Sequence, residues 1–179
     1  MTQIASVYAQ ALYDLGKEEN LTGEILQELR ALKGVFAENS DYLRLLSTPN
    51  LQKDERCGIL DETLRGKVQP YVLNFLKILT EKGYIRQFAL CCEQYRELYN
   101  QDNGILPVKA VTAVALTDEQ QQKLCVKLQQ MTGKTVEIEN QVDPGCLGGV
   151  RLDYEGMRVE DTVQHRLDAV AALLKNTML

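Results

Sequence analysis

The chain has 179 residues, enough to bury a core in one or two compact domains and too few for a large multidomain enzyme. Hydrophobic residues make up 45% and charged residues 25%, a balance typical of globular proteins rather than disordered tails. The formal net charge is −5 and the sequence contains no basic stripe, so it argues against nucleic-acid binding.

The sequence also argues against membrane insertion and export. No apolar run approaches the roughly 18 residues that a bilayer span needs, and no Lys or Arg precedes Lys17, as a signal or transit peptide would require. The cysteines are odd in number and irregularly spaced, which favours reduced buried thiols over a disulfide framework. They are Cys57, Cys91, Cys92, Cys125 and Cys146. We therefore expect a protein of a cytoplasm-like compartment.

A change of composition near Gly104 predicts two domains, 1–104 and 105–179. All aromatic residues except Tyr154 precede this point, and most of the β-branched alternation follows it. Before it the chain is typical of about six helices, because apolar residues recur at helical spacing over 21–36 and 84–99.

Local signals fix several helix ends in this half. Ser40 suits the cap of a short helix that ends before Pro49. Pro70 suits the first turn of a later helix, which Gly83 ends.

After Gly104 the apolar period changes to two. Strands are predicted over 108–116, 136–142, 150–154 and 157–159, and a helix with a Thr117–Gln120 capping box over 117–133. A last helix carries Val163, Leu167, Val170 and Leu174 on one face; a place in the domain core is favoured for them over contact with a partner. The fold class is therefore mainly α, with an N-terminal six-helix bundle and a small C-terminal α+β domain.

The sequence lacks the residue combinations that most catalytic, metal and cofactor sites require. The single histidine, His165, lies opposite the apolar stripe of its helix and is expected in solvent. Cys91 and Cys92 are adjacent, which is neither redox nor zinc spacing. Residues 132–135 resemble the end of a phosphate-binding loop, but a strand follows where a helix is required. Gly148 and Gly149 lack the rest of a dinucleotide fingerprint, so a close backbone approach or a bulge is the better interpretation. We predict no catalytic residue, metal or cofactor.

Two predicted helices, the first and the fifth, carry unusually wide apolar arcs. They span about 240° and 220°, against one narrow stripe on the 21–36 helix. The first arc holds Ile4, Ala5, Val7, Tyr8, Ala9, Leu12, Tyr13, Leu15 and Gly16; the second holds Tyr71, Val72, Leu73, Phe75, Leu76, Ile78 and Leu79. Such helices are either enclosed by neighbours or leave one face for a partner, and spacing alone does not separate these cases. If a partner binds, Ala5 and Ala9 beside larger leucines would make a shallow groove for an amphipathic helix.

Several motifs carry a resemblance along nearly the whole chain. They are Val-Tyr-Ala-Gln-Ala-Leu-Tyr at 7–13, Asn-Phe-Leu at 74–76, Val-Asp-Pro at 142–144, Leu-Gly-Gly-Val at 147–150, Glu-Asp-Thr at 160–162 and Arg-Leu at 166–167. The chain resembles the delta subunit of F-type ATP synthases, the family of the mitochondrial oligomycin sensitivity-conferring protein. It departs from the family pattern at Cys146, at 160–162 and at Gln52, which replaces a small hydroxyl residue at a helix cap.

The resemblance implies a non-catalytic stator subunit. In the family, the six-helix domain sits on the catalytic head and takes N-terminal helices of alpha subunits, one of them between its first and fifth helices. The C-terminal domain holds the b subunits of the peripheral stalk, so the head does not turn with the rotor and torque drives ATP synthesis or proton transport. The place implied is the cytoplasmic face of the cell membrane, as a peripheral protein.

Combining this resemblance with the wide arcs, we predict that Tyr8, Ala9, Leu12, Leu76, Ile78 and Leu79 line the alpha-binding groove. The main alternative is a free-standing helical regulatory module that binds another amphipathic peptide in the same groove. An enzyme acting through a cysteine is a third possibility, for which the sequence assembles no site.

Overall fold

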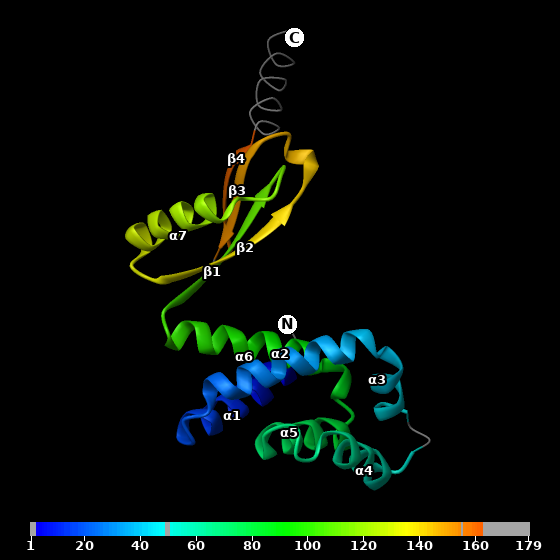
Figure 1. The fold of residues 1–179 in the computed structure, drawn as a ribbon. Helices are drawn as coiled ribbons and strands as arrows, with labels where there is room; N and C mark the ends of the chain where they lie inside the picture. Colours follow the sequence, from blue (N-terminus) through cyan, green and yellow to red (C-terminus); the bar gives the residue numbers. More distant parts are fainter. Residues whose placement is uncertain (1–2, 49–50, 155, 163–179) are drawn as a thin grey trace, which may run out of the picture. The chain divides into compact units, whose positions relative to one another are not determined.

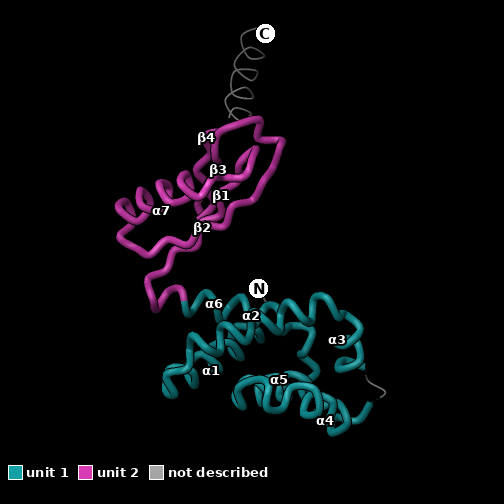
Figure 2. Tube along the Cα trace, in the orientation of Figure 1, with its two compact units in different colours: residues 1–99 teal, residues 100–179 magenta. Residues whose placement is uncertain are grey.

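The computed structural model describes residues 3–48, 51–154 and 156–162. The chain divides into two compact units, Met1–Tyr99 and Asn100–Leu179, which Figure 2 colours separately. We call them the helical unit and the sheet unit. The predicted fold class, a helical bundle followed by a small α+β domain, is confirmed.

The helical unit is built from six α-helices and one short 3₁₀ turn (Figure 1). They are α1 Gln3–Glu18, α2 Thr22–Glu38, α3 Ser40–Leu46, α4 Lys53–Leu64, α5 Pro70–Glu81, η1 Ile85–Gln87 and α6 Phe88–Asp102. Pro70 occupies the first turn of α5 and Gly83 follows that helix with a φ of +76°, as their sequence positions predict. At Gln52 the start of α4 is held by Glu55, whose carboxylate accepts the Gln52 backbone N–H at 3.0 Å.

The helices of this unit share one apolar core. Its largest fully buried side chain is Tyr95 of α6, whose ring meets Tyr13 edge-on at 5.2 Å and whose hydroxyl donates to the carbonyl of Thr22 at 3.1 Å. Gly16 allows Tyr95 and Ile25 to pack closely against α1, because a Cβ at this position would lie 3.0 Å from the Tyr95 hydroxyl and 3.2 Å from Ile25. The end of α1, the start of α2 and the middle of α6 are thus packed at van der Waals contact.

Cys91 and Cys92 lie inside this core and carry no nucleophilic character. Both side chains are buried, and Cys92 Sγ contacts the carbonyl oxygen of Leu29 at 3.7 Å. Burial raises the pKa of Cys91 to about 11 and that of Cys92 to about 12. A thiol nucleophile needs a lowered pKa and access to solvent, so these residues act as small apolar side chains.

In its described residues, 100–154 and 156–162, the sheet unit places one helix on a four-stranded sheet. Its elements are β1 Ile105–Thr112, α7 Asp118–Thr132, β2 Thr135–Val142, η2 Pro144–Cys146, β3 Gly149–Tyr154 and β4 Met157–Thr162. The strand order is β2-β1-β3-β4; β1 and β2 are parallel through the α7 crossover, and the other pairs are antiparallel. Leu106, Val108 and Ala110 of β1 form the centre of the core with Leu128 of α7.

The start of α7 follows the predicted capping box. The Thr117 hydroxyl accepts the Gln120 backbone N–H at 3.3 Å, and the Gln120 side chain accepts the Thr117 N–H at 3.0 Å. Gly133 ends the helix with a φ of +69°.

The end of β1 differs from the prediction. Alternation suggested a strand through Leu116, but β1 ends at Thr112 and Val114 is 74% exposed. The Thr112 hydroxyl donates to the Val114 carbonyl at 2.7 Å, and the Asn140 side chain accepts the Leu116 N–H at 2.9 Å. These bonds turn the chain off the sheet toward α7.

Gly149 sits where β3 begins beside β4, with a φ of +82°. A Cβ at this position would overlap the backbone carbonyl oxygen of Asp161. The expected close backbone approach at Gly148 and Gly149 is therefore confirmed at Gly149.

The predicted last helix with Val163, Leu167, Val170 and Leu174, together with His165, lies outside the described residues. None of the described helices combines the length and apolar character that a membrane span requires.

We expect Gly149→Ala to lower the free energy of unfolding of the sheet unit by about 3 kcal/mol, from a positive φ plus overlap with Asp161. Gly133→Ala is the matched control: its φ is +69° but no atom lies within 4 Å of the added Cβ, so about 1 kcal/mol is expected. Hydrogen exchange of the β1 and β3 amides in the full chain measures both values. Equal losses for the two variants would contradict the close-approach argument.

We further expect iodoacetamide at pH 8 to alkylate Cys91 and Cys92 at least about 100-fold more slowly in the folded chain than in urea. At that pH a thiol with a pKa of about 11 or 12 is almost entirely protonated, and the reactive thiolate gains population only as pH rises toward those values. Mass spectrometry of timed samples gives the rates. A native rate equal to the rate in urea would reopen the cysteine-enzyme hypothesis.

Candidate binding groove

Helices α1 and α5 each carry more apolar surface than the core covers. On α1 the core buries Ala5, Ala9, Leu12, Tyr13 and Gly16. On α5 it buries Val72, Leu73, Phe75, Leu76, Leu79 and Thr80. Apolar side chains beside these, such as Tyr8 and Ile78, remain partly or largely accessible.

Contacts at both ends indicate that α1 and α5 run antiparallel. The rings of Tyr8, early in α1, and Tyr84, just after α5, have centroids 6.1 Å apart. At the opposite end Tyr71, in the first turn of α5, hydrogen-bonds Glu19, which directly follows α1. The start of each helix therefore lies beside the end of the other.

Between the two helices lies an apolar groove of about 260 Å³. It is lined by Tyr8, Ala11, Leu12 and Leu15 of α1 and by Tyr71, Asn74, Phe75 and Ile78 of α5. Both sets follow the spacing i, i+3, i+4, i+7, so each helix contributes two turns of one face. Leu12 and Phe75 are buried and form the floor, whereas Ala11, Asn74 and Ile78 are exposed at the outer edges.

Polar groups are few in the groove. The hydrogen bond to Glu19 raises the pKa of Tyr71, and partial burial adds to the effect, so its hydroxyl stays neutral at physiological pH. The nearby ammonium of Lys77 is paired with Asp61 at 2.7 Å. Asn74 makes no side-chain hydrogen bond with any described residue.

The structure places three of the six predicted residues, Tyr8, Leu12 and Ile78, in the lining of this groove; that they bind an alpha-subunit helix stays a prediction. The other three, Ala9, Leu76 and Leu79, are 0% exposed and belong to the core. Ala5 and Ala9, which sequence alone suggested as the small groove residues, are both buried. Both belong to the core of the helical unit, on the same face of α1 as Tyr13 and Gly16, which meet Tyr95 of α6 and Ile25 of α2; helical periodicity does not reveal which face this is.

The remaining lining residues escaped the prediction. Leu15, Tyr71 and Phe75 lie on the recognised apolar arcs, but nothing in the spacing separates them from their buried neighbours. Ala11 falls within the angular range of the first arc, between Val7 and Ile4, but was not named as part of it, and Asn74 was assigned to the polar side of its helix. Choosing the flank of each arc rather than its centre would have found most of them.

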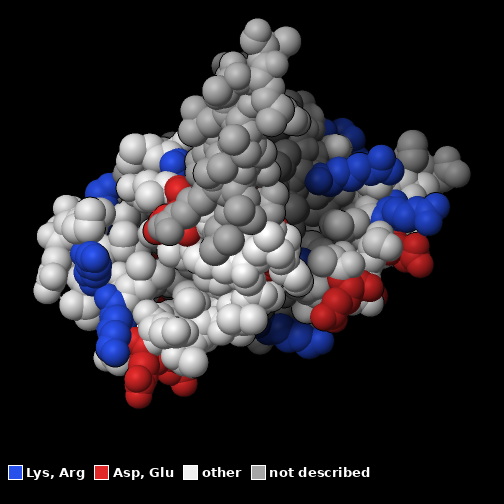
Figure 3. Space-filling view, turned by 90° about the horizontal axis from the view of Figure 1, so that it is seen from above, with Lys and Arg blue, Asp and Glu red and all other residues white. Residues whose placement is uncertain are grey.

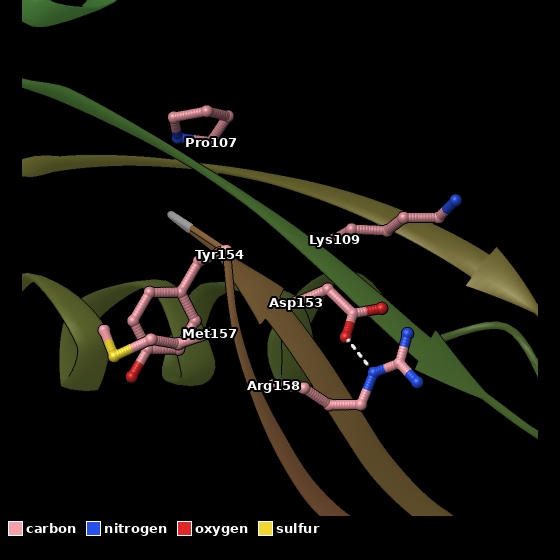
Figure 4. A pocket seen from close by; sticks show the side chains of 7 residues that line it. Pro107, Lys109, Asp153, Tyr154, Met157 and Arg158 are labelled. Carbon is pink, nitrogen blue, oxygen red and sulfur yellow. Dashed lines mark hydrogen bonds and ion pairs between the residues drawn. The ribbon is translucent and has the colours of Figure 1, made fainter.

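The sheet unit has a larger but shallower hollow of about 650 Å³ beside β3 and β4 (Figure 4). Two of its charges are paired, because Arg158 Nε donates to Asp153 at 2.7 Å; Arg151 Nε lies 3.4 Å from the same carboxylate without a hydrogen bond to it. The hydrogen bond from Arg158 is the main cause that lowers the pKa of Asp153. The Lys109 ammonium points away from this pair in Figure 4. We regard this cluster as a surface ion network rather than a catalytic one.

No strong electrostatic site competes with the groove among the described residues. In them, no group of three His, Cys, Asp or Glu side chains could hold a metal ion. On the face drawn in Figure 3, basic and acidic side chains stand near one another around the edge of the described surface. The groove between α1 and α5 differs from the other hollows in its mainly apolar lining.

Comparison with known proteins finds similarity along nearly the whole chain. A family model described as the ATP synthase delta (OSCP) subunit matches residues 4–174. ATP synthase subunit delta of Clostridioides difficile is 32% identical over 98% of this chain and 97% of its own length; that of Leuconostoc mesenteroides is 33% identical over 96% and 95%.

A chain of the mitochondrial ATP synthase hexamer of Toxoplasma gondii has a similar fold, with a TM-score of 0.76 and 19% identity over 97% of this chain and 98% of that one. On the family match and these identities, the chain belongs to the ATP synthase delta (OSCP) subunit family.

Proposed function

We propose that this chain is a stator subunit of a rotary F-type ATP synthase. It links alpha subunits of the catalytic head to the b subunits of the peripheral stalk, so that the head does not turn with the rotor. It is non-catalytic itself and works as a peripheral protein on the cytoplasmic face of the cell membrane. Membership of the ATP synthase delta (OSCP) subunit family supports its assignment to an ATP synthase complex.

The observation that carries the alpha-subunit contact is the groove between α1 and α5. Its two apolar stripes at i, i+3, i+4, i+7 match the anchor spacing of an incoming amphipathic helix. The family resemblance independently assigns an alpha-subunit N-terminal helix to the first and fifth helices. Recognition is thus a helix-in-groove contact in which Tyr8, Leu12 and Ile78 supply apolar surface.

The second contact, with the b subunits, is assigned to the sheet unit by the family resemblance. A protein that holds two partners at once gains from effective concentration, because each contact makes the other intramolecular. Such linkage strengthens an attachment by roughly 10² to 10⁴ without new surface. Two moderate contacts therefore suffice for a stator, and no chemistry is required.

A cysteine enzyme has less support. Cys91 and Cys92 are enclosed in the core, and burial raises the pKa of both thiols well above that of a nucleophilic cysteine. A free-standing regulatory module would use the same groove, so only the identity of the binding partners distinguishes this hypothesis from the stator hypothesis.

We expect Ile78→Glu to weaken binding of a synthetic peptide of the alpha-subunit N-terminal helix at least about tenfold. Ile78 is 44% exposed in the groove wall, so the substitution removes apolar contact and places a carboxylate against the peptide. Titration calorimetry with the full chain gives the affinities. Leu90→Glu is the control, because Leu90 is 41% exposed on α6 and does not line the groove. Equal affinities for wild type and Ile78→Glu, with unchanged circular dichroism, would rule out the groove as the site.

We also expect the chain to bridge two partners. Captured on an immobilised alpha-subunit peptide, the wild-type chain should retain a soluble b-subunit fragment, and Ile78→Glu should lose both the chain and the fragment from the surface. Surface plasmon resonance records the two additions in sequence. Binding of the peptide without any binding of the b fragment, in either order of addition, would favour the regulatory-module alternative.

A further inference from the structure

Asn74 is the one amide among the eight residues that line the groove. It is exposed, and its side chain has no hydrogen bond to any described residue. Asparagine is also a weak helix former, and here it occupies the middle of α5 without capping a helix end. No helix cap or hydrogen bond within the described residues therefore uses this amide, which leaves it available to a partner.

We propose that Asn74 is a specificity residue of the groove: its amide hydrogen-bonds a polar side chain within the apolar face of the bound helix and so fixes the register of that helix. This inference rests on the proposed function, because it takes the alpha-subunit N-terminal helix as the occupant. It goes beyond that function by naming the chemistry that the occupant must carry.

The position of Asn74 within the groove supports this role. On α5 it lies between Tyr71 and Ile78, three residues from one and four from the other, and Ala11 holds the corresponding middle position on α1. Because the two helices are antiparallel, both residues are at mid-groove, above the floor made by Leu12 and Phe75. The methyl of Ala11 takes little space, so a helix can approach closely at the level of Asn74.

The energetics then constrain the partner. In the free protein, water satisfies the exposed Asn74 amide. A helix lying across the groove displaces that water, and an amide enclosed without a partner weakens binding by roughly tenfold or more. A hydroxyl or amide side chain, as in Ser, Thr, Asn or Gln, can both donate to and accept from Asn74.

A fully apolar helix face is therefore disfavoured even though it buries more carbon. A single asparagine in an otherwise apolar helical seam is known to specify register at a cost in affinity. Sliding the bound helix by one turn would carry its polar residue away from Asn74 and leave both groups unpaired. Asn74 thus selects one alignment among those that the apolar stripes alone would allow.

The test is a double-mutant cycle with the full chain and the synthetic alpha-subunit N-terminal peptide. In peptide variants, each polar residue on the apolar face is changed in turn to Leu. We expect Asn74→Leu to bind the unmodified peptide with about tenfold lower affinity than the wild-type chain does. We also expect one peptide variant to bind the wild-type chain about tenfold more weakly than the unmodified peptide does, and to recover that lost affinity when it binds Asn74→Leu. Asn74→Ala, with the best helix former, repeats the measurement without added bulk.

The control is Gln10→Leu, which changes an exposed amide on α1 outside the groove and should leave every affinity unchanged. If the peptide binds in an Ile78-dependent manner but neither Asn74 variant weakens it and no peptide variant couples to them, the specificity inference is wrong and the proposed function stands. If the peptide fails to bind the wild-type chain, both are wrong.

Discussion

The apolar groove of this protein depends on one constraint: an α-helix whose apolar arc is wider than its core contact must leave part of that arc uncovered. Helix α1 meets the core through Ala5, Ala9 and Tyr13, and α5 through Leu76 and Leu79. With 3.6 residues per turn, the apolar side chains beside these point along the flank of each helix. Antiparallel packing brings the two flanks together, so that neither is enclosed by the bundle and both face one groove.

The same packing sets the scale of what can bind. On each helix the lining residues span eight positions, from i to i+7, and the seven steps between them at 1.5 Å each give about 10 Å, or two helical turns. A contact of that length has few anchors and moderate affinity. Under the proposed function, attachment therefore relies on a second contact made by the same chain, and the two contacts reinforce each other through effective concentration.

Several local features of the fold were predictable from sequence, because their causes are local; the exception is Ser40, which is the first residue of α3 and not its cap, since Asn39 takes the cap position without a side-chain hydrogen bond. The Thr117–Gln120 capping box, the first-turn Pro70 and the terminating Gly133 are decided by residues within a few positions of one another. Features set by distant residues were not. Strand β1 stops at Thr112 because of Asn140, and Ala9 is buried while Ala11 is exposed because other helices cover only one side of α1. The width of an apolar arc is thus readable from spacing, but the part of it that faces outward requires the tertiary structure.

The polar residue in the groove has a different physical role from the apolar ones. Apolar side chains such as Leu12 and Phe75 stabilise any helix that covers them, and because the hydrophobic effect is non-directional it discriminates weakly between alignments that bury a similar apolar area. A hydrogen bond is directional and its loss is costly, so Asn74 discriminates between alignments that the apolar stripes would accept equally. Under the proposed stator function this distinction matters, since a bound helix that slipped by one turn would shift its attachment point by about 5.4 Å. A fixed register would give the bound helix one defined position in an apolar groove that otherwise accepts several.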